Sequence, residues 1–170
     1  MIVPPNKPET LPMPEDVGTA RQLWWGVAGL GVVYMGAGIA TMTGERDAMA
    51  KQFLDEIHKS DPAFPASTVD LILTVAFVLT ALVGLVMAGI TVLIAQQLGR
   101  GRSWARTVLT VVAVWLAMGA FATMFTFSAV AGPATIIAGG TAIVQGVLAA
   151  GAAYLSYRPD STKYFLSHRK

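Results

Sequence analysis

Long apolar stretches alternate with short polar segments along the chain of 170 residues. Four of these stretches carry almost no charge, and they cover residues 23–42, 69–98, 104–127 and 133–157. About 20 apolar residues in a helix can cross a hydrocarbon core about 30 Å thick. The stretches lack the alternation of apolar and polar residues that marks a membrane strand, so we interpret them as helices. The pattern therefore predicts an all-α integral membrane protein, an up-down four-helix bundle.

The polar segments divide the chain into three parts. Residues 1–22 are rich in proline and predict a cytoplasmic tail that does not fold alone. Residues 23–157 form the domain of four transmembrane helices, with an outer loop at 43–68, and residues 158–170 form a basic cytoplasmic tail. The stretch 69–98 is longer than a bilayer requires, so we expect it to tilt or to project as a helix into the cytoplasm.

The outer loop contains an amphipathic stretch, "ERDAMAKQFLDEIHK". Met49, Phe53 and Ile57 recur at helical spacing, while most charged residues lie on other faces. The stretch therefore predicts one extracytoplasmic amphipathic helix. This helix either lies on the membrane or on its own bundle, which is the interpretation we favour, or presents a docking face for a partner.

Basic residues indicate the orientation of the bundle. The loop at 99–103 and both tails share one side, and that side is rich in lysine and arginine, whereas acidic residues dominate the loop at 43–68. Cytoplasmic loops of membrane proteins are enriched in these basic residues, so both termini are predicted inside the cell. We expect a multi-pass protein of the cell (inner) membrane.

The segment "GRGRSWAR" separates the second and third apolar stretches. Arg100, Arg102 and Arg106 surround Trp104 there, and tryptophan prefers the membrane interface. Gly101 permits a tight turn. We interpret these four side chains as an anchor in the lipid headgroups of the inner face. A phosphate or headgroup binding site is the functional alternative, because arginines suit anions.

This turn resembles the R-G-R-x-W-A-R turn of small actinobacterial, mycobacterial-type four-helix membrane proteins of unassigned function. The matching residues run from Arg100 to Arg106. The resemblance implies no catalytic residues. It does imply that the chain is an accessory subunit of an envelope machine, with an Mce-type lipid transport complex as the first expectation.

Small residues recur every fourth position in the last apolar stretch. Such a stripe forms a groove into which another helix backbone can approach closely. We favour a neighbouring helix of the same chain, although a helix of another chain would satisfy the pattern equally. The stripe consists of Ala134, Ala138, Ala142, Gly146 and Ala150.

The residues available for chemistry are few. The chain has no cysteine, which excludes disulfides and thiolate ligands. Asp70 stands at the outer end of its stretch, where a negative charge suits a helix N-terminus. Gln145 is the strongest polar group near the middle of a stretch, and we expect it to form an interhelical hydrogen bond or to line a substrate path. We therefore expect no catalytic residue, cofactor or metal site, and no binding of nucleic acid.

These observations favour a non-catalytic accessory or assembly subunit of a larger membrane complex, with an envelope lipid transporter as the first expectation. The alternatives are a stand-alone or homo-oligomeric protein that handles lipid or solute, and a subunit of a respiratory or cell-wall synthesis complex. An enzyme is not expected. Membrane lipids and a larger protein complex are the predicted partners, and the predicted partner contacts are Phe53, Ile57, Tyr164 and Phe165.

Overall fold

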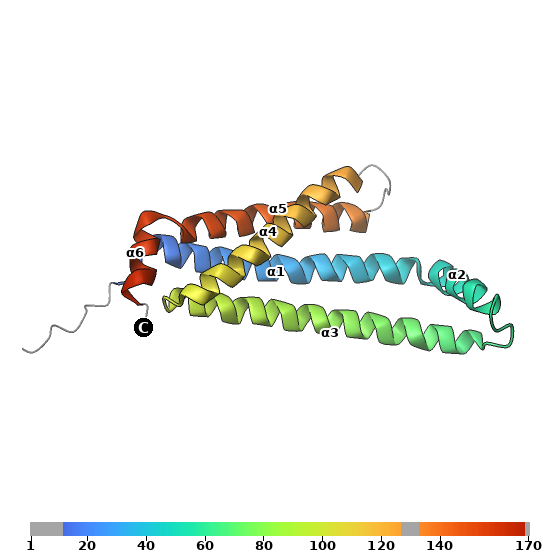
Figure 1. The fold of residues 1–170 in the computed structure, drawn as a ribbon. Helices are drawn as coiled ribbons and strands as arrows, with labels where there is room; N and C mark the ends of the chain where they lie inside the picture. The colour runs from blue at the N-terminus through green and yellow to red at the C-terminus, as the bar shows by residue number, and fades with distance from the viewer. Residues whose placement is uncertain (1–11, 127–132, 169–170) are drawn as a thin grey trace, which may run out of the picture.

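The computed structural model describes residues 12–126 and 133–168, and within these ranges the regular secondary structure is entirely α-helical. The helices are α1 (Glu15–Gly44), α2 (Arg46–His58), α3 (Ala66–Gly99), α4 (Ser103–Thr126), α5 (Pro133–Ser156) and α6 (Pro159–Ser167) (Figure 1). Four of them, α1, α3, α4 and α5, are long and apolar enough to cross a membrane. The predicted all-α bundle of four spans is confirmed.

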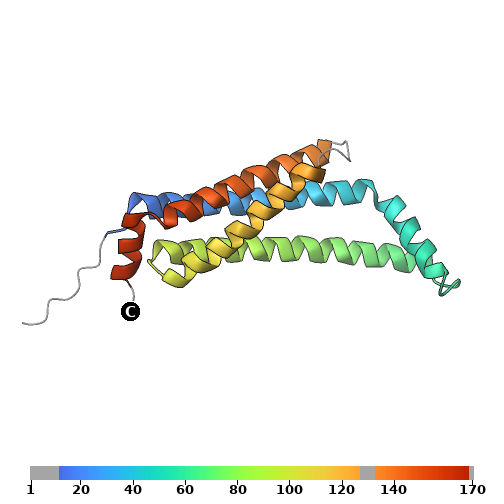
Figure 2. The ribbon, with the colours of Figure 1, turned by 45° about the horizontal axis from the view of Figure 1, so that its top comes forward.

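Helix α1 lies at the centre of the bundle and packs against both α5 and α3. Helix α4 packs along α5 but makes few contacts with α3. Both views show α4 crossing the bundle obliquely and diverging from α3 after the short turn that joins them (Figures 1 and 2). The short loop therefore does not make α3 and α4 closely packed neighbours, because each helix packs on a different partner.

The turn between α3 and α4 has the hydrogen bonds of a Schellman motif. The Arg102 amide donates to the Gln97 carbonyl at 3.2 Å, and the Gly101 amide donates to the Leu98 carbonyl at 3.0 Å. Gly101 has a positive φ of 73°. Only glycine adopts this conformation at little steric cost, so the predicted tight turn at Gly101 is present.

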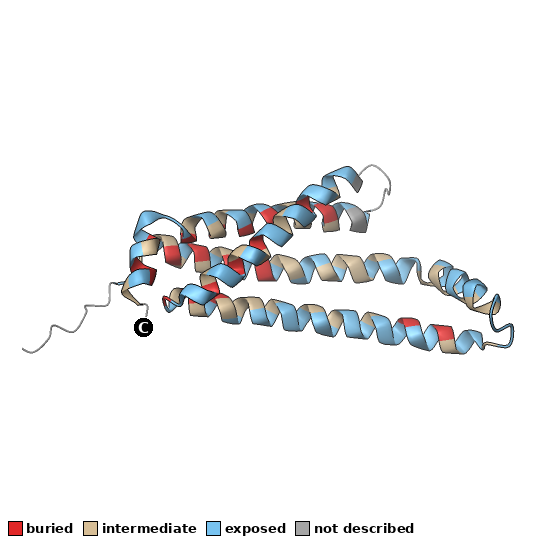
Figure 3. Ribbon diagram, in the orientation of Figure 1, coloured by how far each residue is buried: buried red, intermediate tan, exposed pale blue. Residues whose placement is uncertain are grey.

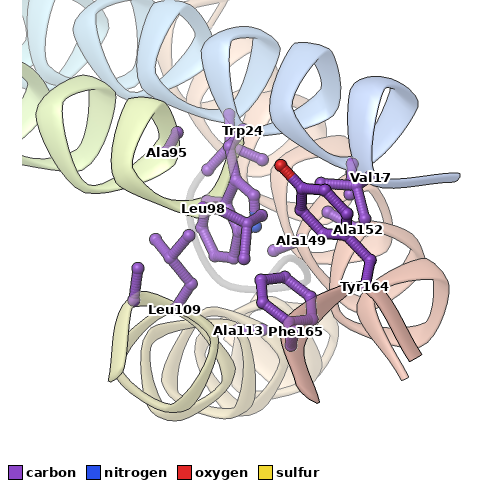
Figure 4. Close-up of a cluster of buried hydrophobic side chains, with 13 residues drawn as sticks. Val17, Trp24, Ala95, Leu98, Leu109, Ala113, Ala149, Ala152, Tyr164 and Phe165 are labelled. Carbon is purple, nitrogen blue, oxygen red and sulfur yellow. The ribbon is translucent and has the colours of Figure 1, made fainter. Parts of the chain in front are cut away.

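The most buried cluster lies at the end of the bundle that carries α6, called here the α6 end (Figure 4). Val17, Ala20 and Trp24 contribute to it from one face of α1. Most of the remaining helix surface is exposed (Figure 3), as a bilayer-facing surface would be. Residues 15–22, predicted as tail, instead continue the first helix, because Val17 and Ala20 lie on the same face as Trp24 and are buried with it.

The predicted tail at 158–170 also folds in its described part. Helix α6 turns across the ends of the other helices and buries Tyr164 and Phe165. The Tyr164 hydroxyl donates a 3.0 Å hydrogen bond to the Gly99 carbonyl at the end of α3. Burial raises the pKa of this hydroxyl above its ordinary value of 10.0.

At the opposite end, called here the α2 end, α2 connects α1 to α3. Arg46 forms a 2.7 Å ion pair with Asp70, and its Nη2 also donates to the Thr74 hydroxyl at 2.6 Å. Asp70 therefore joins α2 to α3 in addition to its place near a helix N-terminus. Helix α3 extends past α4 and α5 at this end (Figures 1 and 2). The expected tilt or cytoplasmic projection of this helix stays a prediction. At the α6 end, its residues Ala95 and Leu98 are buried in the core.

Candidate functional site

A groove opens between α1, α3 and α4, where α4 diverges from α3. It has a volume of about 480 Å³, which lies within the range of about 300–1,000 Å³ that is usual for ligand pockets. None of the described residues that line it is charged, and many are small. The lining consists of Val27, Ala28, Gly31, Tyr34, Met35, Gly84, Met87, Ala88, Thr91, Val111, Val112, Trp115, Leu116 and Gln145.

Gln145 reaches this groove from α5. Its Nε2 donates a 2.9 Å hydrogen bond to the Val27 carbonyl of α1, which is the kind of interhelical bond expected from the sequence. A Cβ atom added to Gly31 would lie 3.0 Å from the same nitrogen. Glycine at position 31 therefore leaves the space that the amide occupies.

A smaller hollow of about 140 Å³ continues beside the groove toward the α2 end. Both hollows are lined by Tyr34, Trp115, Leu116 and Gln145. Thr91 lines the groove, and Thr123 lines the smaller hollow. Together the two hollows follow α4 along much of its length, and the Gln145 amide lies where they meet.

Only part of the predicted stripe of small residues packs against another helix of the chain. Gly146 is buried against α4, and an added Cβ would lie 2.6 Å from the Ala120 Cβ and 3.2 Å from the Leu116 carbonyl oxygen. The neighbour at this point is a helix of the same chain, as we favoured. Ala138 and Ala142 are half-buried, and the side chain of Ala134 lies outside the described residues.

Ala150 is exposed and therefore does not take part in the helix packing within this chain. Four residues turn a helix by about 400°, and a four-residue stripe therefore drifts by about 40° per step from the contact line. The contact face continues instead through Ala149 and Ala152, both fully buried. Residues three apart share a helix face as well as residues four apart, so the sequence also allowed these two alanines.

The four residues of the predicted anchor separate into two environments. Arg100, Arg102 and Trp104 are exposed at the α6 end. Arg106 is half-buried, and its guanidinium carbon lies 3.6 Å from the centroid of the Tyr157 ring. Arg106 is therefore held by an aromatic ring of its own chain, because α4 packs along α5, and only the other three side chains have the open exposure expected of an anchor.

Of the four predicted partner contacts, two reach the surface and two are buried within the bundle. Phe53 on α2 is exposed and Ile57 is half-buried. Tyr164 and Phe165 are buried inside their own bundle, so the interpretation of these two as a surface for a partner was wrong. Their position depends on α6 folding back across the ends of the other helices, which no local pattern in the tail reveals.

Among the described residues, no cluster of histidine or acidic side chains has the arrangement of a metal site. His58 bonds the Phe64 carbonyl at 3.1 Å, and His168 contacts the Tyr164 ring, so the two histidines lie at opposite ends of the bundle. No protein-family model, no curated protein and no solved structure matches this chain. The fold and the four apolar spans define a small multi-pass membrane protein.

Proposed function

We propose that this chain is a non-catalytic, lipid-binding subunit of a larger membrane complex, and that the groove at Gln145 holds an acyl chain. The groove carries the proposal. It is apolar along most of its lining and has one amide at its floor, which is the usual composition of a pocket for a lipophilic ligand.

The lining favours an acyl chain over a polar solute. A charged solute would lose its hydration without gaining a counter-charge, because none of the described residues lining the groove is charged. Trp115, which is 76% exposed, forms a wall on the lipid side. An extended hydrocarbon chain entering past this wall can follow α4 into the smaller hollow that shares Gln145.

Acyl-chain binding is tested by photolabelling with a phospholipid that carries a photoactivatable acyl chain. Ala88→Phe places a ring in the groove, whereas Ala76→Phe adds the same ring to an exposed position of α3 that does not line it. We expect labelled peptides to map to the groove lining, and Ala88→Phe alone to reduce that labelling. Uniform labelling of all exposed faces, or equal labelling of the two variants, would show only bulk lipid contact.

Membership of a larger complex is the second part of the proposal. The resemblance of the Arg100–Arg106 turn points to an envelope lipid transporter of the Mce type. Phe53 supports a protein contact, since this aromatic side chain is 44% exposed on α2, which lies beyond the ends of α4 and α5 (Figure 1). Large exposed aromatic residues are typical anchors of protein interfaces.

Purification in mild detergent tests this membership. We expect the chain to migrate with a larger assembly, and Phe53→Ser to weaken that association. Gln52→Ser, at the adjacent exposed position of α2, is the matched control and should not. Migration of the intact chain alone, or equal effects of both substitutions, would contradict the subunit proposal.

The second candidate function is a stand-alone or homo-oligomeric lipid-handling protein. The burial of Tyr164 and Phe165 favours it, because the C-terminal helix satisfies its own aromatic side chains without a partner. The same detergent experiment separates the candidates. A chain that migrates alone, or with copies of itself, and still shows groove labelling would establish the stand-alone function.

A further inference from the structure

A third hollow lies at the α6 end, between the first turns of α4, Tyr157 just after the end of α5, and α6. It has a volume of about 460 Å³ and is separate from the groove at Gln145. It is the more polar of the two in its lining. That lining consists of Ser103, Trp104, Arg106, Thr107, Tyr157, Thr162, Phe165 and Leu166.

Among the described residues that line it, Arg106 alone is charged. Its guanidinium carbon lies 3.6 Å from the Tyr157 ring centroid and 5.5 Å from that of Phe165. Its Nη2 reaches the Thr162 hydroxyl at 3.5 Å, a long contact. Within residues 12–126 and 133–168, Arg106 forms no ion pair with a carboxylate. The two rings therefore fix a half-buried positive charge that lacks a counter-ion.

The groups beside this charge suit a phosphate. Ser103 and Thr107 line the same hollow and carry hydroxyl donors, and arginine with hydroxyl groups is a frequent combination in phosphate binding. The remaining wall is apolar and open, since Trp104 is 48% exposed and Leu166 is 61% exposed. A phosphate bound here would have apolar surface beside it at the end of the spans.

We infer that this hollow binds the phosphodiester group of an anionic phospholipid. Arg106 pairs with the phosphate, the Ser103 and Thr107 hydroxyls donate to its oxygens, and the first carbons of the lipid lie against Trp104 and Leu166. The excess of basic side chains at this end attracts anionic lipid to the site. The exposed Arg100 and Arg102 add to this general attraction but do not line the hollow.

Native mass spectrometry tests the inference on the full chain released from nanodiscs. The discs contain phosphatidylcholine alone or phosphatidylcholine with phosphatidylglycerol. We expect one phosphatidylglycerol to remain bound to the unmodified chain, and Arg106→Gln to weaken that binding at least about tenfold. Arg102→Gln removes the same charge from an exposed position outside the hollow, so it should change the retained lipid little.

Two further variants separate binding from folding. Ser103→Ala with Thr107→Val removes the hydroxyl donors without touching the stack of Arg106 on Tyr157, and it should also weaken retention. Arg106→Lys keeps the charge but loses the planar fork, so we expect partial retention. Thermal unfolding in phosphatidylcholine alone identifies any variant whose fold is damaged.

Three results would overturn the inference. If Arg106→Gln and Arg102→Gln lose the same amount of bound phosphatidylglycerol, the binding depends only on net charge. The Ser103→Ala, Thr107→Val variant could retain the lipid fully while Arg106→Gln both loses the lipid and unfolds at a lower temperature. That result would show that Arg106 has only a structural role. Displacement of the lipid by inorganic phosphate at equal concentration would assign the hollow to free phosphate.

Discussion

The Nε2 atom of Gln145 on α5 donates a 2.9 Å hydrogen bond to the carbonyl oxygen of Val27 on α1. This bond joins two helices that pack extensively along each other, and it lies at the floor of the groove lined by α1, α3 and α4. A polar side chain is thus satisfied inside an apolar bundle and remains beside the space where we propose that an acyl chain binds.

Replacing Gln145 by leucine should lower the stability of the bundle by about 1 kcal/mol, which is the usual size of an interhelical hydrogen bond in membranes. The expected measurement is unfolding in mixed micelles of mild detergent and dodecyl sulfate. Val147→Leu, at an exposed position of the same helix, is the control. A neutral Gln145→Leu would show that the bond to Val27 adds nothing to stability.

Gly146→Ala should destabilise the protein by about 1–3 kcal/mol, since the new methyl group meets the backbone of α4 and overpacks the contact. The same substitution at Gly151 adds a methyl group where no atom lies within 4 Å. Gly151→Ala should therefore be neutral or slightly stabilising, because alanine favours the helix. If the two variants unfold alike, α4 and α5 are not packed closely at Gly146.

Stability should decrease at high pH because of Tyr164. Burial raises the pKa of this hydroxyl above 10.0, so the folded state favours the protonated form. This contribution is complete below the unfolded pKa of 10.0 and is lost as the pH rises through the higher pKa of the folded state. Unfolding followed between pH 8 and 12 would measure it.

Tyr164→Phe is the control for that pH dependence. It should lower stability at neutral pH, because the Gly99 carbonyl loses a hydrogen bond, by about 0.5–1.5 kcal/mol. It should also flatten the decrease above pH 10. An equally steep decrease in this variant would assign the alkaline transition to other groups.

The orientation of the chain remains a prediction from charge. A reporter fused at residue 60 should lie outside the cell, and a reporter fused after residue 170 should lie inside. Both follow from the basic α6 end and the acidic loop at 43–68. A cytoplasmic signal at residue 60 would reverse the bundle, and the hollow at Arg106 would then face the other leaflet.

Local sequence pattern was sufficient for the spans and for the turn at Gly101. Hydropathy depends on residues within one stretch, and a membrane requires that each stretch satisfy its own backbone, so four helices follow from four apolar runs. The positive φ at Gly101 likewise depends on a few adjacent residues. The amphipathic character of α2 also follows from spacing within one segment.

Contacts between distant segments were decided only by the tertiary structure. Nothing in the sequence near Arg106 shows that Tyr157 lies under its guanidinium, and nothing near Tyr164 shows that Gly99 accepts its hydroxyl. Between apolar helices in lipid, association depends on close packing rather than on hydrophobicity, so the small differences in shape that set the angle of α4 are not readable as a pattern. That angle opens the groove at Gln145, and the fold of α6 onto α4 forms the hollow at Arg106.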